Sequence, residues 1–391
     1  MTSQVAIFNQ RGVAVASDTV MTITSDGGTK TINNTEKLWA LGDAHLVVVA
    51  LSGNSNINSV HAGVLMTEWS KSLDRPLPTV EDYAANFCSW LADERVILPP
   101  ASDSMVARQC LGNHFFYVRD RLISEARRSD LDDSAIAATL LRFSLDGLDY
   151  LKQLPSYDGV SEGVDVNILE NPEIEFEALV NEYFEDVPGL DQSREVLFES
   201  GFLVLAKAQR MPMDTTLGFI GYGSSEYFAR SVRVDCRGRY GGQARTIVDR
   251  PFGVSHDNMG AAISTFAQTD AIHGFLRGAQ YNVLDLVYDN VWDYLVEQDE
   301  DPDEGVARAT NAVSVVKDRV NDSLHQRFID PMLDLISSLS LRDVADLATA
   351  LVGIQAMRAN ASPEPPGVGG LIESLVIDRA DGVRWVQRLP K

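Results

Sequence analysis

The sequence predicts an α+β fold in which two β-sheets stack face to face and helices cover both outer sides, a four-layer αββα sandwich. Two observations predict this arrangement. Strand-like segments gather at the start, in the middle and at the end of the chain, with helical segments between them. The strand-like runs are nearly continuously apolar, which is typical of sheets that are buried on both faces. With 391 residues, 45% of them hydrophobic, the chain can form one large core, and we expect a single domain over residues 1–391.

The first 55 residues contain four short runs of apolar and β-branched side chains. These runs are residues 4–9, 12–17, 37–41 and 46–51. The first two are separated by Asn-Gln-Arg-Gly at residues 9–12, a composition that suits a tight hairpin turn. The polar segment around Asp26 is expected to be a loop.

Helical periodicity begins after Gly53. Residues 56–73 carry apolar side chains at helical spacing, and we expect a helix there. A second helix is expected over residues 79–91, because Thr79 suits the N-cap and Asp82 stands where a capping box needs a carboxylate.

Residues 100–212 differ from the rest of the chain because helical patterns and acidic loops dominate them. The helical patterns are residues 134–154, 173–184 and 193–208. One short strand is expected at residues 114–118. We interpret the whole segment as a helical insertion into the sandwich.

Strand character returns after the insertion and again at the end of the chain. The expected strands are residues 216–221, 227–235, 261–266, 372–378 and 383–389. The glycine-rich residues 237–242 are expected to form a turn. Extended C-terminal helices are expected at residues 269–298, 304–338 and 341–360.

Charge and composition exclude several classes of function. The net charge of −23, from 56 acidic and 33 basic residues, repels phosphate backbones, so nucleic acid is not an expected partner. The sequence contains no run of about 18 apolar residues, so no membrane span is expected. The N-terminus lacks the basic and then apolar segments of a signal peptide. Three widely spaced cysteines argue against a disulfide framework, so we expect a cytoplasmic protein. The six histidines show no paired ligand spacing, and neither a metal nor a cofactor is expected.

Thr2 is a candidate nucleophile because it follows the initiator Met1. Removal of Met1 leaves Thr2 with a free α-amine, whose pKa of about 7.7–8.0 lies near neutrality. Such an amine can accept the proton of its own residue's hydroxyl, so that one residue is both nucleophile and base. A threonine after the initiator is also common without any function, and Thr2 alone would not support the assignment.

The sequence around Thr2 strengthens its assignment as a nucleophile. Residues 2–8 and 12–18 resemble the opening strands of proteasome β-subunits and their bacterial relatives, which are N-terminal-nucleophile (Ntn) hydrolases. The resemblance implies that Thr2 begins a strand and that Asp18, after the second strand, lies close to the catalytic centre. Lys37 stands in the place of the family's lysine, and the charge of Asp18 would hold it in position.

The segment Leu51-Ser52-Gly53 resembles the turn that opens the first long helix in this family. The resemblance assigns the Gly53 amide, at a helix N-terminus, to the oxyanion hole. We expect the Leu51 side chain to line a substrate pocket that prefers apolar groups. A structural salt bridge between Asp18 and Lys37 at the strand ends is the alternative interpretation of that pair.

The resemblance covers about the first 95 residues, residues 215–280 and the last 50. At the end of the chain, residues 367–370 (Gly-Val-Gly-Gly), the strand after them and the turn at residues 380–382 resemble the family's closing strand pair. The insertion has no counterpart, and the helices after residue 280 are longer than usual.

The sequence departs from the family pattern at two places where active members carry side chains that position the terminal amine. Ala267 stands where active proteasome subunits carry a serine, and Pro365 and Val368 stand where they carry an aspartate and a serine. We consider as substitutes Gln268, Thr269 and Asp270, or the carboxylate of Glu364.

These observations predict an N-terminal-threonine hydrolase, a peptidase that cleaves peptide bonds through an acyl-enzyme on Thr2 after removal of Met1. Two alternatives stay open: a non-catalytic scaffold or assembly subunit of the same fold, and an Ntn hydrolase of small amides. The expected partners are a peptide or protein substrate and further copies of this chain, in a homo-oligomer whose geometry differs from a proteasome ring. The bulky acidic insertion would repel its own copy at the usual ring contact.

Overall fold

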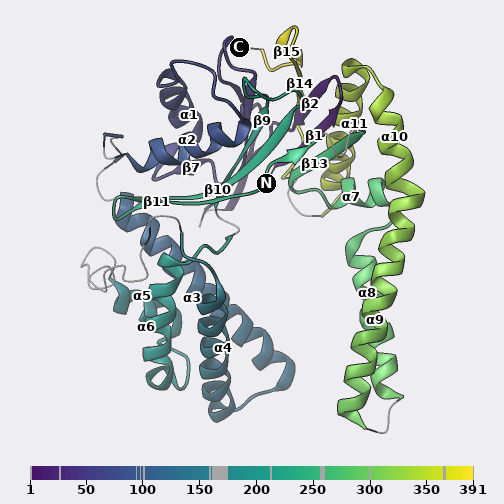
Figure 1. The fold of residues 1–391 in the computed structure, drawn as a ribbon. Helices are drawn as coiled ribbons and strands as arrows, with labels where there is room; N and C mark the ends of the chain where they lie inside the picture. The colour runs from purple at the N-terminus through teal and green to yellow at the C-terminus, as the bar shows by residue number, and fades with distance from the viewer. Residues whose placement is uncertain are drawn as a thin grey trace.

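The computed structural model describes residues 2–25, 28–93, 95–96, 98–99, 102–157, 160, 175–211, 214–255, 260–298, 301–363 and 367–390. Met1, Glu364 and Pro365 lie outside these described residues. The chain has an α+β fold, as the sequence predicts, with antiparallel sheets and long helices (Figure 1).

The first sheet contains the chain's N-terminal strand, which is paired on both sides. Its order is β13 (Ala261–Ala267), β1 (Ser3–Asn9), β2 (Gly12–Ser17), β14 (Glu373–Asp378) and β15 (Gly382–Gln387). Strand β1 is antiparallel to both neighbours, with Ser3 opposite Ala267 and Gln4 opposite Ser17. The first residues of β1 are therefore held from both sides.

The second sheet contains the strand that ends at Gly53. Its order is β11 (Gln243–Val248), β10 (Arg230–Tyr240), β9 (Thr215–Gly221), β6 (Val47–Gly53) and β5 (Leu38–Ala40), and β12 (Phe252–Gly253) pairs with β10. Two small hairpins lie apart from it: β3 (Met21–Ser25) with β4 (Gly28–Ile32), and β7 (Asn56–Ile57) with β8 (Val60–His61).

Alternation along the strands divides the apolar side chains between separate cores. In β1, Ala6 and Phe8 share a core with residues of the second sheet such as Val48, whereas Val5 and Ile7 point into a different core. Successive side chains of a strand point to opposite faces, so a sheet that is buried on both faces needs a continuous apolar run. This explains why the strand runs show no polar alternation.

Helices cover the faces that do not meet the other sheet (Figure 1). Helices α1 (Ala62–Lys71) and α2 (Val80–Ala92) pack on the second sheet, where Trp69 and Phe87 meet Phe219 of β9. The other face of the first sheet packs against α7 (Asp270–Arg277), α10 (Asp330–Ser338) and α11 (Leu341–Ala361).

The insertion forms a helical unit with its own core. It consists of α3 (Ser102–Ser129), α4 (Asp133–Gln153), α5 (Phe176–Phe184) and α6 (Leu190–Ala206). Leu111, Phe115 and Phe184 are fully buried within it. Figure 1 shows this unit and the hairpin of α8 (Tyr281–Glu297) and α9 (Pro302–Leu324) projecting from the same side of the sheets as two separate arms.

Several sequence-based boundaries are confirmed. The capping box at the start of α2 forms as expected. The Thr79 side chain accepts a hydrogen bond from the Asp82 N–H, and the Asp82 side chain accepts one from the Thr79 N–H. The helices expected at residues 134–154 and 341–360 match α4 and α11 within a few residues.

Other boundaries are wrong, each for a local reason. The helix expected from residue 56 begins only at Ala62, because Asn58 and Ser59 adopt left-handed conformations (φ 48° and 65°) that turn the hairpin β7–β8. The strand expected at residues 114–118 lies within α3, where Phe115 and Val118 share one buried face.

Strand pairing corrects one further expectation. Residues 237–240 continue β10 as a long strand, and the turn is limited to Gly241 and Gly242. Asp26, at the centre of the expected loop, lies outside the described residues, between the paired strands β3 and β4.

The C-terminal helices are interrupted more often than their periodicity predicts. Gly278 (φ 72°) ends α7 and packs against Phe328, so the expected helix at residues 269–298 is two helices. A π-helical segment at His325–Ile329 separates α9 from α10. Among the described residues, no helix is both long enough and apolar enough to cross a bilayer.

Candidate active site

Thr2 is held in the first sheet immediately before β1. It is 6% exposed, and its carbonyl accepts a hydrogen bond from the Gln268 N–H at 2.8 Å. The next residue, Ser3, donates its N–H to Asp18 Oδ1 at 2.9 Å and accepts from the Asp18 N–H at 3.1 Å. Thr2 is thus fixed by the backbone of β13 on one side and by the end of β2 on the other.

Asp18 is fully buried, and its carboxylate accepts four hydrogen bonds. Three come from backbone N–H groups: Ser3 at 2.9 Å, Gly369 at 3.1 Å and Val20 at 3.2 Å. The fourth comes from Lys37 Nζ at 2.8 Å. A buried carboxylate is tolerated when it is paired and its lone pairs are satisfied, and both conditions hold here.

Lys37 lies just before β5 and is 4% exposed. Besides Asp18, its ammonium group donates to the Val20 carbonyl at 2.6 Å. Burial lowers the pKa of the Lys37 ammonium below its ordinary value, and the Asp18 carboxylate opposes this shift. A lysine of this kind releases a proton more readily than one in water.

Gly53 is the last residue of β6 and pairs with Thr215 of β9. Its φ of 74° favours glycine, and a Cβ at this position would lie 2.2 Å from the Asp214 carbonyl oxygen. The expected position at a helix N-terminus is wrong, because α1 begins at Ala62. The Gly53 N–H therefore gains nothing from a helix dipole.

A chain of hydrogen bonds connects the two sheets at this end. Gln4 Nε2 donates to the Leu51 carbonyl at 2.9 Å, and the Leu51 N–H donates to the Lys37 carbonyl at 2.9 Å. Thr2 lies two residues before Gln4, and Gly53 lies two residues after Leu51. Thr2, Asp18, Lys37 and Gly53 therefore gather at one end of the sheets.

The prediction that Leu51 lines a substrate pocket is wrong. Its side chain is 4% exposed and belongs to the core beneath α1 and α2. Its main chain takes part in the link between the sheets instead.

Gln268, Thr269 and Asp270, considered as substitutes for the family's amine-positioning side chains, differ in their environment. Asp270 is engaged elsewhere, since it binds Arg358 at 2.8 Å and Gln355 at 2.7 Å on α11. Thr269 immediately precedes α7, and its carbonyl accepts from the His273 N–H at 2.8 Å.

Gln268 is the substitute that contacts Thr2, through its backbone N–H. Its side-chain oxygen Oε1 is buried and has no hydrogen-bond partner. Ala267, in the left-handed conformation with φ 63°, ends β13 just before it.

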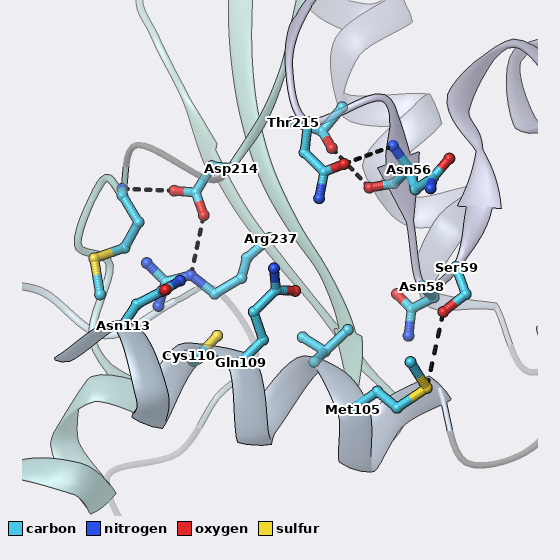
Figure 2. A pocket seen from close by; sticks show the side chains of 13 residues that line it. Asn56, Asn58, Ser59, Met105, Gln109, Cys110, Asn113, Asp214, Thr215 and Arg237 are labelled. Atoms are coloured by element: carbon cyan, nitrogen blue, oxygen red, sulfur yellow. Dashed lines mark hydrogen bonds and ion pairs between the residues drawn. The ribbon is translucent and has the colours of Figure 1, made fainter. Parts of the chain in front are cut away.

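Two parts of this region are not predicted by the sequence. Gly369 acts through its backbone N–H on Asp18, a role that no side-chain pattern reveals. A cavity of about 350 Å³ adjoins the end of β6 and is bounded by α3 of the insertion (Figure 2). Within the described ranges, no cluster of three or more His, Cys, Asp or Glu side chains is arranged to bind a metal ion.

No protein-family model matches this chain, and no curated protein sequence matches it. The assignment of a function therefore depends on the residues and geometry described above.

The replacement Lys37→Met is expected to lower the free energy of unfolding by about 3–5 kcal/mol, because it leaves the Asp18 charge buried without a counter-charge. Chemical denaturation at neutral pH measures this loss. The exposed Lys71–Glu68 pair supplies the control, and Lys71→Met is expected to change stability little. The double variant Asp18→Asn/Lys37→Met should recover part of the loss. Strictly additive single-variant effects would show that the two side chains are not coupled.

Proposed function

We propose that this protein is an N-terminal-threonine hydrolase of the proteasome β-subunit type, a peptidase that acts through an acyl-enzyme on Thr2. The observation that carries the proposal is the buried Asp18–Lys37 pair, whose carboxylate also binds the residue next to Thr2. Asp18 thereby ties the Lys37 ammonium group to the backbone that carries Thr2.

The arrangement of the cores supports the finer fold assignment, an αββα sandwich of the Ntn-hydrolase type. One core draws on both sheets, and two others lie between a sheet and its helices. Four layers in the order helix, sheet, sheet, helix account for these three cores.

The proposed reaction begins after removal of Met1. The α-amine of Thr2 accepts the proton of the Thr2 hydroxyl, and Oγ1 attacks the carbonyl carbon of the substrate. The Gly53 N–H stabilises the resulting oxyanion, and the Lys37 ammonium lowers the cost of the developing alkoxide. The Thr2 α-ammonium group returns this proton to the leaving amine as the C–N bond breaks, which leaves an ester on Thr2. Water then hydrolyses this ester and frees the Thr2 hydroxyl.

A non-catalytic scaffold of the same fold is the second candidate. Ala267, in place of the family's serine, favours it. The presence of Thr2, Asp18, Lys37 and Gly53 opposes it, since a scaffold needs none of them. An Ntn hydrolase of small amides shares the chemistry and differs in its substrate.

Intact-mass measurement of the cellular protein is expected to show a chain without Met1. A peptide epoxyketone should then add to the processed protein, and hydrolysis of fluorogenic peptides should fall at least about a thousandfold in Thr2→Ala. Thr2→Ser should keep part of the activity, because it retains a hydroxyl and an α-amine. Retained Met1, or full activity in Thr2→Ala, would rule out the mechanism.

Replacements at Gln268 are expected to shift the pH dependence of kcat/KM. An acceptor that binds the α-ammonium group favours its charged form and raises its pKa. Loss of the acceptor in Gln268→Ala should move the acid limb of the profile to lower pH, and the carboxylate of Gln268→Glu should move it to higher pH. Unchanged limbs in both variants would exclude contact with the amine.

We propose a homo-oligomer that forms through α8. The side chains of Val283, Leu286, Val287, Val291 and Tyr294 are 38–62% exposed. At helical spacing they form one apolar stripe on an arm that stands clear of the sheets (Figure 1). A second copy of the arm offers the same stripe, which a two-fold symmetric contact would bury.

The double replacement Leu286→Glu/Val287→Glu is expected to produce monomers at micromolar concentration, because it buries two carboxylates in the proposed contact. Sedimentation velocity measures the change in mass. Asp285→Lys, which changes a charge on the opposite side of α8 from the stripe, is the control and should leave the oligomer intact. A wild-type protein that sediments as a monomer would contradict the proposal.

A further inference from the structure

A second cavity, of about 770 Å³, lies within the insertion and is lined by side chains of α3 and α4 and by residues 209–211. We call it the α3–α4 cavity. The two helices pack against each other along the arm that the insertion forms (Figure 1). The deep part of the lining is apolar, since Val118, Phe143 and Leu151 are at most 7% exposed.

Aromatic side chains surround this apolar part. Phe116, Tyr117 and Tyr150 all line the α3–α4 cavity and are 51–61% exposed. A volume of this size with an aromatic lining is typical of sites that bind small molecules. The aromatic faces favour an aromatic or aliphatic group as the part of the ligand that enters.

Two ionisable side chains of the lining carry no free charge. His114 is 7% exposed, and its Nε2 lies 3.0 Å from Ser200 Oγ. Burial lowers the pKa of His114 to about 4, so its ring is neutral at neutral pH. Arg210 forms an ion pair with Asp235 at 2.7 Å and a second one with Asp249, so its charge is compensated.

Arg121 on α3 and Asp146 on α4 are the other charged side chains of the lining, and both are exposed. Within the described part of the chain, neither has an ion-pair or hydrogen-bond partner. The guanidinium carbon of Arg121 lies 4.2 Å from the centre of the Phe143 ring, and that of Arg142 lies 4.8 Å from it. Positive charge therefore gathers at Phe143, and Asp146 follows Phe143 by almost one turn of α4, about 4.5 Å.

Opposite charges beside an apolar cavity restrict the class of ligand. An anion would be repelled by Asp146, and a cation would be repelled by the guanidinium groups. An apolar molecule without charge would remove water from both charges and replace none of its hydrogen bonds. A zwitterion with an apolar group avoids these costs, because Arg121 can bind its carboxylate and Asp146 its ammonium group.

We infer that the α3–α4 cavity binds a free amino acid with an aromatic or aliphatic side chain, through its α-carboxylate and its α-ammonium group. In an α-amino acid these two groups are attached to one carbon atom, which suits protein charges that lie about one helical turn apart. The inference goes beyond the proposed function, because no step of the peptidase mechanism uses this cavity.

The test is isothermal titration calorimetry with the full-length protein at neutral pH. The probes are phenylalanine, N-acetylphenylalanine, which lacks the ammonium group, and phenylalaninamide, which lacks the carboxylate. Phenylalanine is expected to bind about tenfold more tightly than either derivative, the effect of one charge-assisted hydrogen bond. Glycine, which has the two charges without an apolar side chain, should bind at least about tenfold more weakly than phenylalanine.

Replacement of each charge should remove one preference and keep the other. Arg121→Gln is expected to bind phenylalanine and phenylalaninamide equally, and Asp146→Asn is expected to bind phenylalanine and N-acetylphenylalanine equally. Arg127→Gln removes an exposed arginine of α3 that does not line the cavity, and this control should keep the wild-type affinities. The melting temperatures of all three variants should stay close to the wild-type value, because the side chains are exposed.

No binding of phenylalanine at millimolar concentration, equal binding of the three phenylalanine probes, or wild-type preferences in both Arg121→Gln and Asp146→Asn would overturn the inference. Tighter binding of the dipeptide Phe-Phe than of phenylalanine would overturn the choice of a free amino acid. Thr2→Ala should bind phenylalanine with the wild-type affinity. Failure of this site and failure of the proposed function are therefore distinguishable.

Discussion

The buried carboxylate of Asp18 is the contact on which this end of the molecule depends. It joins the start of β1, the segment after β2, the lysine before β5 and the glycine-rich segment before β14. Burial of a charge costs several kcal/mol unless donors surround it, and here four donors from four segments converge on one group. Thr2 is positioned by the same contacts, so the geometry of the terminus and the stability of the sheets cannot be separated.

A second buried pair connects the insertion to this framework. Arg237 of β10 binds Asp214 before β9 and two carbonyls near the end of the insertion. Asp214 in turn fixes the backbone beside Gly53, where its carbonyl leaves no room for a Cβ. The insertion is therefore attached to the sheets at the residue pair that borders the candidate oxyanion donor.

Strand patterns and a family resemblance were sufficient to predict the α+β class and the proximity of Asp18 to Lys37. They do not predict features that depend on the local backbone geometry. A continuous apolar run does not show which face of the sheet a side chain takes, so the sequence wrongly predicts a pocket position for Leu51, whose side chain lies in the core. The start of α1 was misplaced because Asn58 turns the chain there through hydrogen bonds to Arg239, a residue 181 positions away. The cavity wall could not be predicted either, since its two sides come from segments with no relationship in sequence.

The stability of the sheets and the lining of the cavity at the end of β6 depend on different elements. Thr2, Asp18 and Lys37 lie among buried strands, where almost any replacement disturbs the core. Met105, Gln109 and Asn113 of α3, by contrast, line the cavity with exposed or partly exposed side chains and lie outside the Asp18–Lys37 contact. Replacements at these three positions can therefore alter the cavity at little cost to the stability of the sheets.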